Sequence, residues 1–153
     1  MNIFVLDSDI KKCAQYHNNK HVVKIILESA QLLCTAHWEL GGEAPYKKTH
    51  HNHPCGVWAR QSKKNYMWLC KLALQLCKEF EHRFNKKHKT KDVILWCLQN
   101  VPKFNDSDMT PFAQAMPDEF KSSDAVEAYR NYYMIDKRHL ADWGNRPAPE
   151  WWF

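Results

Sequence analysis

The segment from residue 16 to residue 35, YHNNKHVVKIILESAQLLCT, carries one line of polar side chains through an otherwise apolar helical pattern. Its members recur at steps of three and four residues, so in a helix they all point within about 40° of one direction. They are His17, His21, Lys24, Glu28, Gln31 and Thr35. A surface helix normally has a broad polar face, whereas this line is narrow and mixed in charge. We therefore expect it to form the wall of a pocket or groove.

The groups on this line are those that perform acid–base and nucleophilic chemistry. On a helix buried on nearly every side, an unpaired charge costs several kcal/mol, so Lys24 and Glu28 need a partner or a function. Glu28 could act as a general acid or base, and Lys24 could bind phosphate or serve as an amine nucleophile. His17 or His21 could handle a proton, and Gln31 is a candidate ligand contact. The alternative is a simple i,i+4 ion pair between Lys24 and Glu28 at a narrow solvent-facing seam.

The loop THHNHPC contains three histidines and a cysteine. Alternate residues of an extended loop point the same way, so His51, His53 and Cys55 could converge on zinc. The pattern H-x-H-x-C is a weak metal motif, and we predict no cofactor; any metal would be held by His50, His51 and His53. We favour a loop that enters the next helix through a first-turn proline. It would then lend a histidine or Asn52 to a polar cluster beside the stripe.

Cationic and aromatic side chains alternate near the end of the chain. On a helix, Tyr129, Arg130, Tyr133 and Lys137 fall within about 80° of one another, and Arg146 follows in the tail. Such a face suits phosphate contacts combined with base stacking. Aromatic core packing with basic ends that reach solvent is the equal alternative.

Chain breakers and caps divide the sequence into the elements that must position these residues. We predict an extended segment at 2–6, a helix at 11–40, a polar loop at 41–56, a helix at 57–85, a short helix at 92–99 capped by Thr90, and a last helix at 122–143 capped by Ser122 or Ser123. Asn65 interrupts the apolar stripe of the second long helix and is a further candidate ligand contact. The predicted class is all-α: one compact domain over 1–153, with three long helices, one short helix and an aromatic C-terminal tail.

Composition narrows the classes of function. Hydrophobic residues make up 44% of the 153 residues and aromatic residues 13%, which excludes disorder. With four glycines and no Gly-rich phosphate motif, the chain does not resemble the common nucleotide-binding folds. A net charge of +5 suits an anionic partner, DNA or a nucleotide, although it also suits simple solubility. Without a signal peptide or membrane span, we expect a cytoplasmic protein with reduced cysteines; the oligomeric state is left open.

With these segments in place, the chain resembles the pyrimidine-dimer DNA glycosylases of the endonuclease V type. The resemblance rests on CAQYHNNKHVVK at the start of the first long helix, HPCGVW at the entry to the second, CKEFEHRFNKK at its end, and the TPFAQAMPDEF loop before YRNYY. The chain is also similar to small bacteriophage proteins with the same His-rich helix and NHP loop. A phage origin would place it in the host cytoplasm.

The resemblance implies an all-α enzyme that flips a nucleotide, cleaves the glycosylic bond and nicks DNA through a Schiff base. The family's nucleophile is the α-amino group exposed when the initiator Met is removed, supported by a glutamate for which Glu28 is the candidate. Asn2 is larger than the residues before which Met is usually removed, so we expect Lys24, with its pKa lowered by burial beside the two histidines, to be the local amine. The predicted function is thus a DNA glycosylase-like protein acting on a flipped, damaged or modified base. The alternatives are a non-catalytic binder of a nucleotide or modified base and a metal-dependent hydrolase.

Overall fold

The computed structural model describes all residues from 1 to 153 and contains only helices and connecting segments. The elements are α1 (Ile10–Tyr16), α2 (Asn19–Glu39), α3 (Pro54–Gln61), α4 (Lys63–Phe84), α5 (Lys91–Gln99), the 3-10 helix η1 (Asp118–Phe120), α6 (Ala125–Asp136) and the 3-10 helix η2 (Arg138–Leu140). The predicted all-α class is confirmed, whereas several of the predicted helix boundaries are wrong.

The predicted helix at 11–40 is two helices, because the chain leaves helical conformation at His17 and Asn18. Both residues are extended, with ψ angles of 134° and 164°. The Asn18 side chain accepts a hydrogen bond from the backbone N–H of His21 at 2.9 Å and thereby caps α2. An N-cap residue must itself lie outside the helix. This break removes His17 from the polar line of α2.

A second break divides the predicted helix at 57–85. Ser62 is extended, with φ −153° and ψ 160°, and its hydroxyl accepts from the backbone N–H of Asn65 at 3.1 Å to cap α4. The preceding helix, α3, begins at Pro54, so the proline lies in its first turn as predicted. The ring of His53 caps α3 by accepting from the backbone N–H of Cys55 at 3.1 Å.

The later elements are shorter than predicted. Helix α5 matches the predicted short helix within one residue, and Thr90 occupies its N-cap position without a side-chain hydrogen bond. Helix α6 begins only after Asp124, whose carboxylate accepts hydrogen bonds from the backbone N–H groups of Val126 and Glu127. Ser122, the expected cap, instead exchanges backbone hydrogen bonds with the side chain of Gln114.

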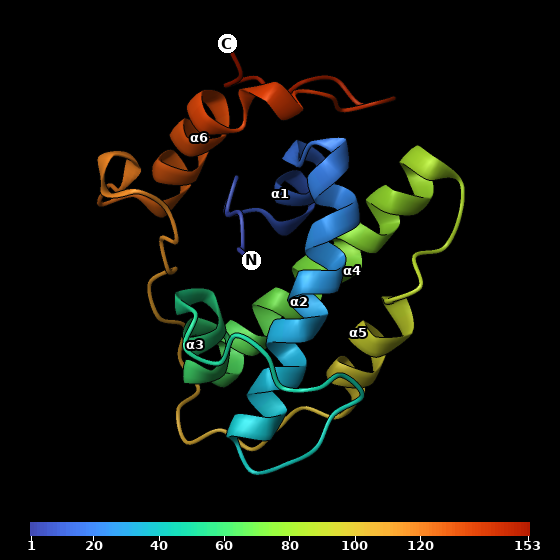
Figure 1. Cartoon of the computed structure of the whole chain (residues 1–153), viewed down its shortest axis with the longest axis vertical. Helices are drawn as coiled ribbons and strands as arrows, with labels where there is room; N and C mark the ends of the chain where they lie inside the picture. The colour runs from blue at the N-terminus through green and yellow to red at the C-terminus, as the bar shows by residue number, and fades with distance from the viewer.

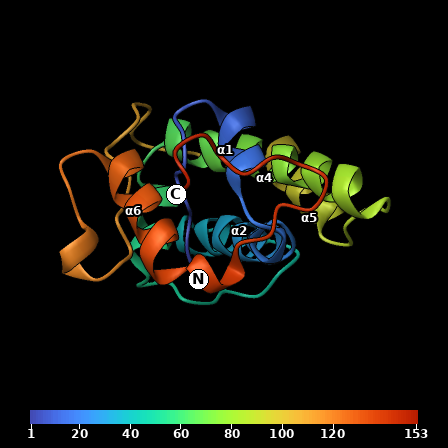
Figure 2. The same ribbon diagram turned by 90° about the horizontal axis from the view of Figure 1, so that it is seen from above.

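Helix α2 is the centre of the molecule and packs against α3, α4 and α5. The segment from Ile3 to Leu6 is extended, as predicted, and all four of its side chains are buried. In Figure 1 this segment and the N-terminus lie between α2 and α6. Figure 2 shows α1 and α4 on the other side of α2 from the N-terminus. None of the helices is both long and apolar enough to cross a membrane.

Candidate active site

The amino terminus and Glu28 form a direct ion pair. The α-amino nitrogen of Met1 lies 3.3 Å from Glu28 Oε1, and the two side chains are 6% and 12% exposed. The backbone N–H of Asn2 donates to the same oxygen at 3.2 Å. The carboxylate from the middle of α2 therefore contacts the nitrogen atoms of both of the first two residues.

The side chain of Asn2 fixes the position of this terminus. Its Oδ1 accepts from the backbone N–H of Ile3 at 2.8 Å and from the hydroxyl of Tyr129 at 3.0 Å. The thiol of Cys55 reaches the same oxygen at 3.4 Å, and Asn2 Nδ2 donates to the carbonyl of Ala115 at 2.8 Å. Asn2 is only 7% exposed. A buried amide with all these partners holds a single orientation.

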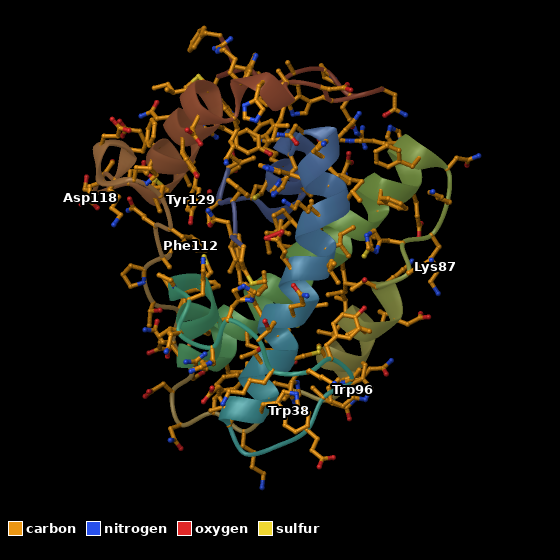
Figure 3. The ribbon with its side chains drawn as sticks, viewed as in Figure 1. Trp38, Lys87, Trp96, Phe112, Asp118 and Tyr129 are labelled. Carbon is orange, nitrogen blue, oxygen red and sulfur yellow. The ribbon has the colours of Figure 1, made fainter.

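A pocket of about 140 Å³ opens beside the ion pair, and its lining comes from the N-terminal segment, α2 and the end of α6. The lining residues are Met1, Asn2, Phe4, His21, Lys24, Ile25, Glu28, Tyr132 and Lys137. In Figure 3 the labelled Tyr129 marks the α6 side of this region. One carboxylate, three amines and an imidazole thus face a small, polar space.

His21 is held in place by two neighbours. Its Nδ1 lies 2.7 Å from the hydroxyl of Tyr133, which also accepts from the backbone N–H of Asn18 at 3.1 Å. Its ring stacks on Phe4 with 4.3 Å between centroids. Burial, and then the nearby charges of His17, Lys137 and Lys24, lower the pKa of His21 to about 3. His21 is therefore neutral at pH 7, and with the Tyr133 hydroxyl donating to Nδ1 its Nε2–H is available to a ligand.

Two lysines place positive charge at the pocket. Lys137 lies 3.4 Å from the carboxylate of Asp136 and 5.1 Å from the centroid of the Tyr132 ring. Lys24 is exposed, so the burial expected for this side chain is wrong. The alternative ion pair between Lys24 and Glu28 is also wrong, because Glu28 pairs with the amino terminus instead.

The loop histidines do not form a metal site. No group of three or more His, Cys, Asp or Glu side chains could hold a metal ion. His50, His51 and Asn52 are exposed. His53 lies close enough to the terminus that the positive amine, after burial, contributes to lowering the pKa of its ring. The loop therefore brings one histidine, His53, to the edge of the candidate site.

Three members of the predicted polar line do not reach the pocket: His17, Gln31 and Thr35. Thr35 is buried, and its hydroxyl donates to the carbonyl of Thr49 at 3.0 Å. His17 is fully buried at the end of α1, where its Nδ1 lies 2.7 Å from the carbonyl of Cys13 and its Nε2 has no partner. Burial lowers its pKa to about 4. Gln31 lies one turn beyond Glu28 and is half-buried outside the pocket lining.

The predicted binding residues of the C-terminal region divide between the pocket and the protein interior. Lys137 lines the pocket, and Tyr129 and Tyr133 are buried directly behind Asn2 and His21. Arg130 donates to the carbonyl of Leu6 and to the carboxylate of Asp7, each at 2.8 Å. These two arginine contacts are intramolecular, so the structure does not bring Arg130 to the pocket.

Arg146 and Asn65 also have structural partners. Arg146 donates to the buried carboxylate of Glu79 at 2.7 Å, and Arg83 contacts the same carboxylate at 3.0 Å. Asn65 donates to the carbonyl of Trp58 at 2.8 Å and to the hydroxyl of Thr110 at 2.7 Å. Both side chains connect separate segments of the fold and lie away from the pocket.

A terminal amine held against a helix carboxylate, beside further cations, is the arrangement that the sequence resemblance implies. The sequence model of the pyrimidine dimer DNA glycosylase family matches residues 1–92, which is more than half of the 153 residues. The chain belongs to the pyrimidine dimer DNA glycosylase family. No curated protein and no solved structure matches it.

The part of this family member that matches the glycosylase model contains the ion pair and the α2 side of the pocket. Tyr132 and Lys137, which close the pocket, come from the remaining part of the chain. Sequence reasoning missed Met1 as the partner of Glu28 and gave no role to Phe4 or Tyr132. The signal for Met1 is the terminal amine that the family resemblance implies, although the size of Asn2 argues in the sequence against removal of Met1.

Proposed function

We propose that this protein is a DNA glycosylase that removes a base from a flipped nucleotide and then cleaves the strand through a Schiff base. The observation that carries the proposal is the contact of 3.3 Å between the terminal amine and Glu28, at the edge of a pocket with two lysines. A nucleophilic amine next to a general base, in a site that favours anionic ligands, is what this reaction needs.

In the proposed reaction the neutral amine attacks the anomeric carbon of the nucleotide. The base leaves with the electrons of the glycosylic bond and takes up a proton from water. The amine then loses a proton to Glu28, which passes it to the ring oxygen as the sugar ring opens and a protonated imine forms. The Glu28 carboxylate next removes a proton from the adjacent sugar carbon, which expels the 3′ phosphate, and water hydrolyses the imine to free the amine. The negative charge of Glu28 also stabilises the positive charge that develops on the sugar.

The terminal amine suits this role better than Lys24. Lys24 is exposed and has no contact with Glu28, whereas the terminus is held by that carboxylate and by the Asn2 network. We assign Lys24 and Lys137 to the phosphates of the flipped nucleotide and His21 Nε2–H to its base or sugar.

The site accommodates either of two terminal residues. With Met1 in place, its own amine meets Glu28 at 3.3 Å. If Met1 is removed, the nitrogen of Asn2, already 3.2 Å from Glu28 Oε1, becomes the amine. Loss of the Met1 side chain would also widen the pocket that it lines. The chemistry therefore survives either form of the terminus.

Glu28→Gln tests the proposal. On duplexes that contain a pyrimidine dimer, other base lesions or an abasic site, we expect wild-type protein to release base or nick the strand. Removing a positioned proton acceptor should slow this reaction by about 100-fold or more while leaving DNA affinity nearly unchanged. Glu39→Gln, the same change on the same helix where the carboxylate pairs with Lys48, is the matched control. DNA binding by wild-type protein without turnover on any of these duplexes would contradict the proposal.

A further inference from the structure

The basic segment NKKHKTK, residues 85–91, is anchored to α2 by one histidine. His88 Nε2 lies 3.0 Å from the carbonyl of Val23, and His88 Nδ1 accepts from the backbone N–H of Thr90 at 3.1 Å. The His88 ring also meets Phe80 edge-on, with 4.8 Å between centroids. These contacts fix the segment against the helix that carries Glu28.

A groove of about 460 Å³ lies between this segment and α2. Its apolar residues are Val23, Leu27 and Phe80. Val23 and Leu27 are each 41% exposed, so α2 is not buried on nearly every side as expected from its sequence. The exposed apolar face of this helix is bordered by lysines instead of being covered by another element.

The charge of the groove is largely uncompensated. Four lysines line it: Lys24, Lys86, Lys87 and Lys89. Lys87 pairs with Asp92 at 2.8 Å, and the other three have no carboxylate within 4 Å. Such a concentration of positive charge attracts a polyanion.

The groove and the candidate active site share one lining residue on α2. Lys24 lines both the groove and the pocket beside Glu28. In Figure 1 the N-terminus lies on one side of α2 and the 85–91 segment on the other, and Figure 3 labels Lys87 on that segment. A polyanion that occupies the groove would therefore pass directly beside the pocket.

We propose that this groove binds the backbone phosphates of the DNA strand next to the nucleotide that enters the pocket. The inference rests on the proposed function and adds the path of the strand. Exposed lysines on a fixed segment suit contacts with phosphates that are independent of sequence, and the apolar floor suits the faces of the intervening sugars. The groove therefore positions the strand, and the pocket performs the chemistry.

A matched control exists on another face of the molecule. A second groove of about 460 Å³ lies between α1, α4 and α5 and is also lined by lysines, among them Lys11, Lys71 and Lys78. Figure 2 shows α1 and α4 on the side away from the N-terminus. Neutralising three lysines there changes the net charge by the same amount as neutralising three lysines beside α2.

The experiment compares Lys86→Gln/Lys87→Gln/Lys89→Gln with Lys11→Gln/Lys71→Gln/Lys78→Gln. Binding to a short duplex, either undamaged or with an abasic-site analogue, is measured by fluorescence anisotropy over a range of NaCl concentrations. Each lost phosphate contact should lower the slope of log K against log salt by about one. We expect the first triple variant to lose about three units of slope and the control to stay near wild type. The first variant should still react at saturating DNA, because it keeps Glu28 and the terminus.

Equal salt slopes for the two triple variants would overturn the groove proposal while leaving the proposed function intact. Wild-type protein that binds neither duplex would overturn both proposals. All six lysines are exposed on the surface, so we expect both triple variants to fold. Thermal unfolding followed by circular dichroism checks this. His88→Gln adds an independent test, because it keeps every lysine but removes the anchor, and it should also weaken binding.

Discussion

At the scale of residues, the arrangement around Glu28 depends on buried polar contacts more than on charge alone. Asn2 places the terminus through four side-chain contacts, and one of these comes from the hydroxyl of Tyr129. That hydroxyl also contacts the carbonyl of Ala113 at 2.7 Å and accepts from the backbone N–H of Ala115 at 3.2 Å. Tyr129 therefore acts on the amine through Asn2 and is a positioning residue.

Tyr129→Phe tests this role. The substitution leaves Asn2 without one partner and Ala115 with an unsatisfied N–H, so we expect a loss of about 1–3 kcal/mol in the free energy of unfolding. Displacement of the terminus should slow trapping of the imine by borohydride by about tenfold or more, without a change in DNA affinity. Tyr66→Phe removes another buried hydroxyl, which donates to the carbonyl of Cys97 at 2.8 Å away from the pocket and the groove, and is the control. Equal trapping rates for the two variants would contradict the positioning role.

The two buried histidines predict how stability depends on pH. Their pKa values fall from 6.5 to about 4 for His17 and to about 3 for His21, mainly because burial opposes the charged ring. In the unfolded chain both rings take up protons as the pH falls through 6.5, and in the fold they do not. Their contribution to stability is therefore complete above pH 6.5 and decreases below it, at up to about 1.4 kcal/mol per pH unit for each ring.

Urea unfolding of wild type, His17→Gln and His21→Gln at several pH values from 7 to 5 measures this effect. In each variant the free energy of unfolding should decrease less steeply with falling pH than in wild type, because glutamine does not titrate and the contribution of the replaced histidine is absent. Variants whose stability falls with pH as steeply as that of wild type would show that the two histidines are not buried in their neutral form.

At the scale of elements, the hydrophobic pattern located the helices but not the breaks within them. Asn18 and Ser62 lie inside continuous helical patterns, and each acts as an N-cap that ends one helix and begins the next. An N-cap requires a single residue to adopt an extended backbone conformation, and the periodicity of hydrophobic residues does not show where this happens. The unpredicted break also affects the candidate site. Glu28, Lys24 and His21 share a face of α2, as predicted from their spacing, whereas the break at Asn18 removes His17 from that face.

Asn18→Ala tests the importance of this break. Loss of the cap should lower the free energy of unfolding by about 1 kcal/mol, because the backbone N–H of His21 loses its acceptor. Asn18→Ser keeps a capping oxygen and should retain most of the stability. An alanine variant as stable as wild type would mean that α1 and α2 can join into one helix at no cost.

At the scale of the whole molecule, the site is assembled from distant parts of the chain. The first residues, α2 and the end of α6 supply the pocket lining, and the C-terminal tail is tied to α4 through Glu79 and Arg146. The contacts of Tyr129 with Asn2 and of Tyr133 with His21 join segments more than 100 residues apart. No local pattern predicts such contacts, and the sequence alone therefore predicts ligand binding for these two tyrosines instead of a structural role.

The sequence also does not predict the exposed face of α2. Its apolar side chains suggested burial on all sides, and only the packing shows that Val23 and Leu27 border a lysine-lined groove. Net charge suggested an anionic partner, but it could not locate the place where that partner binds. The location follows from His88, which fixes the basic segment beside α2.

The central claim is that the terminal amine beside Glu28 is the nucleophile. The most direct measurement is to incubate the protein with duplex DNA containing an abasic site, reduce with borohydride, digest, and locate the adduct by mass spectrometry. We predict that the sugar remnant is found on the α-amino nitrogen of Met1, or of Asn2 if Met1 has been removed, and that Lys24→Gln still forms this adduct. An adduct on Lys24 or on another lysine, or no adduct at all, would contradict the claim.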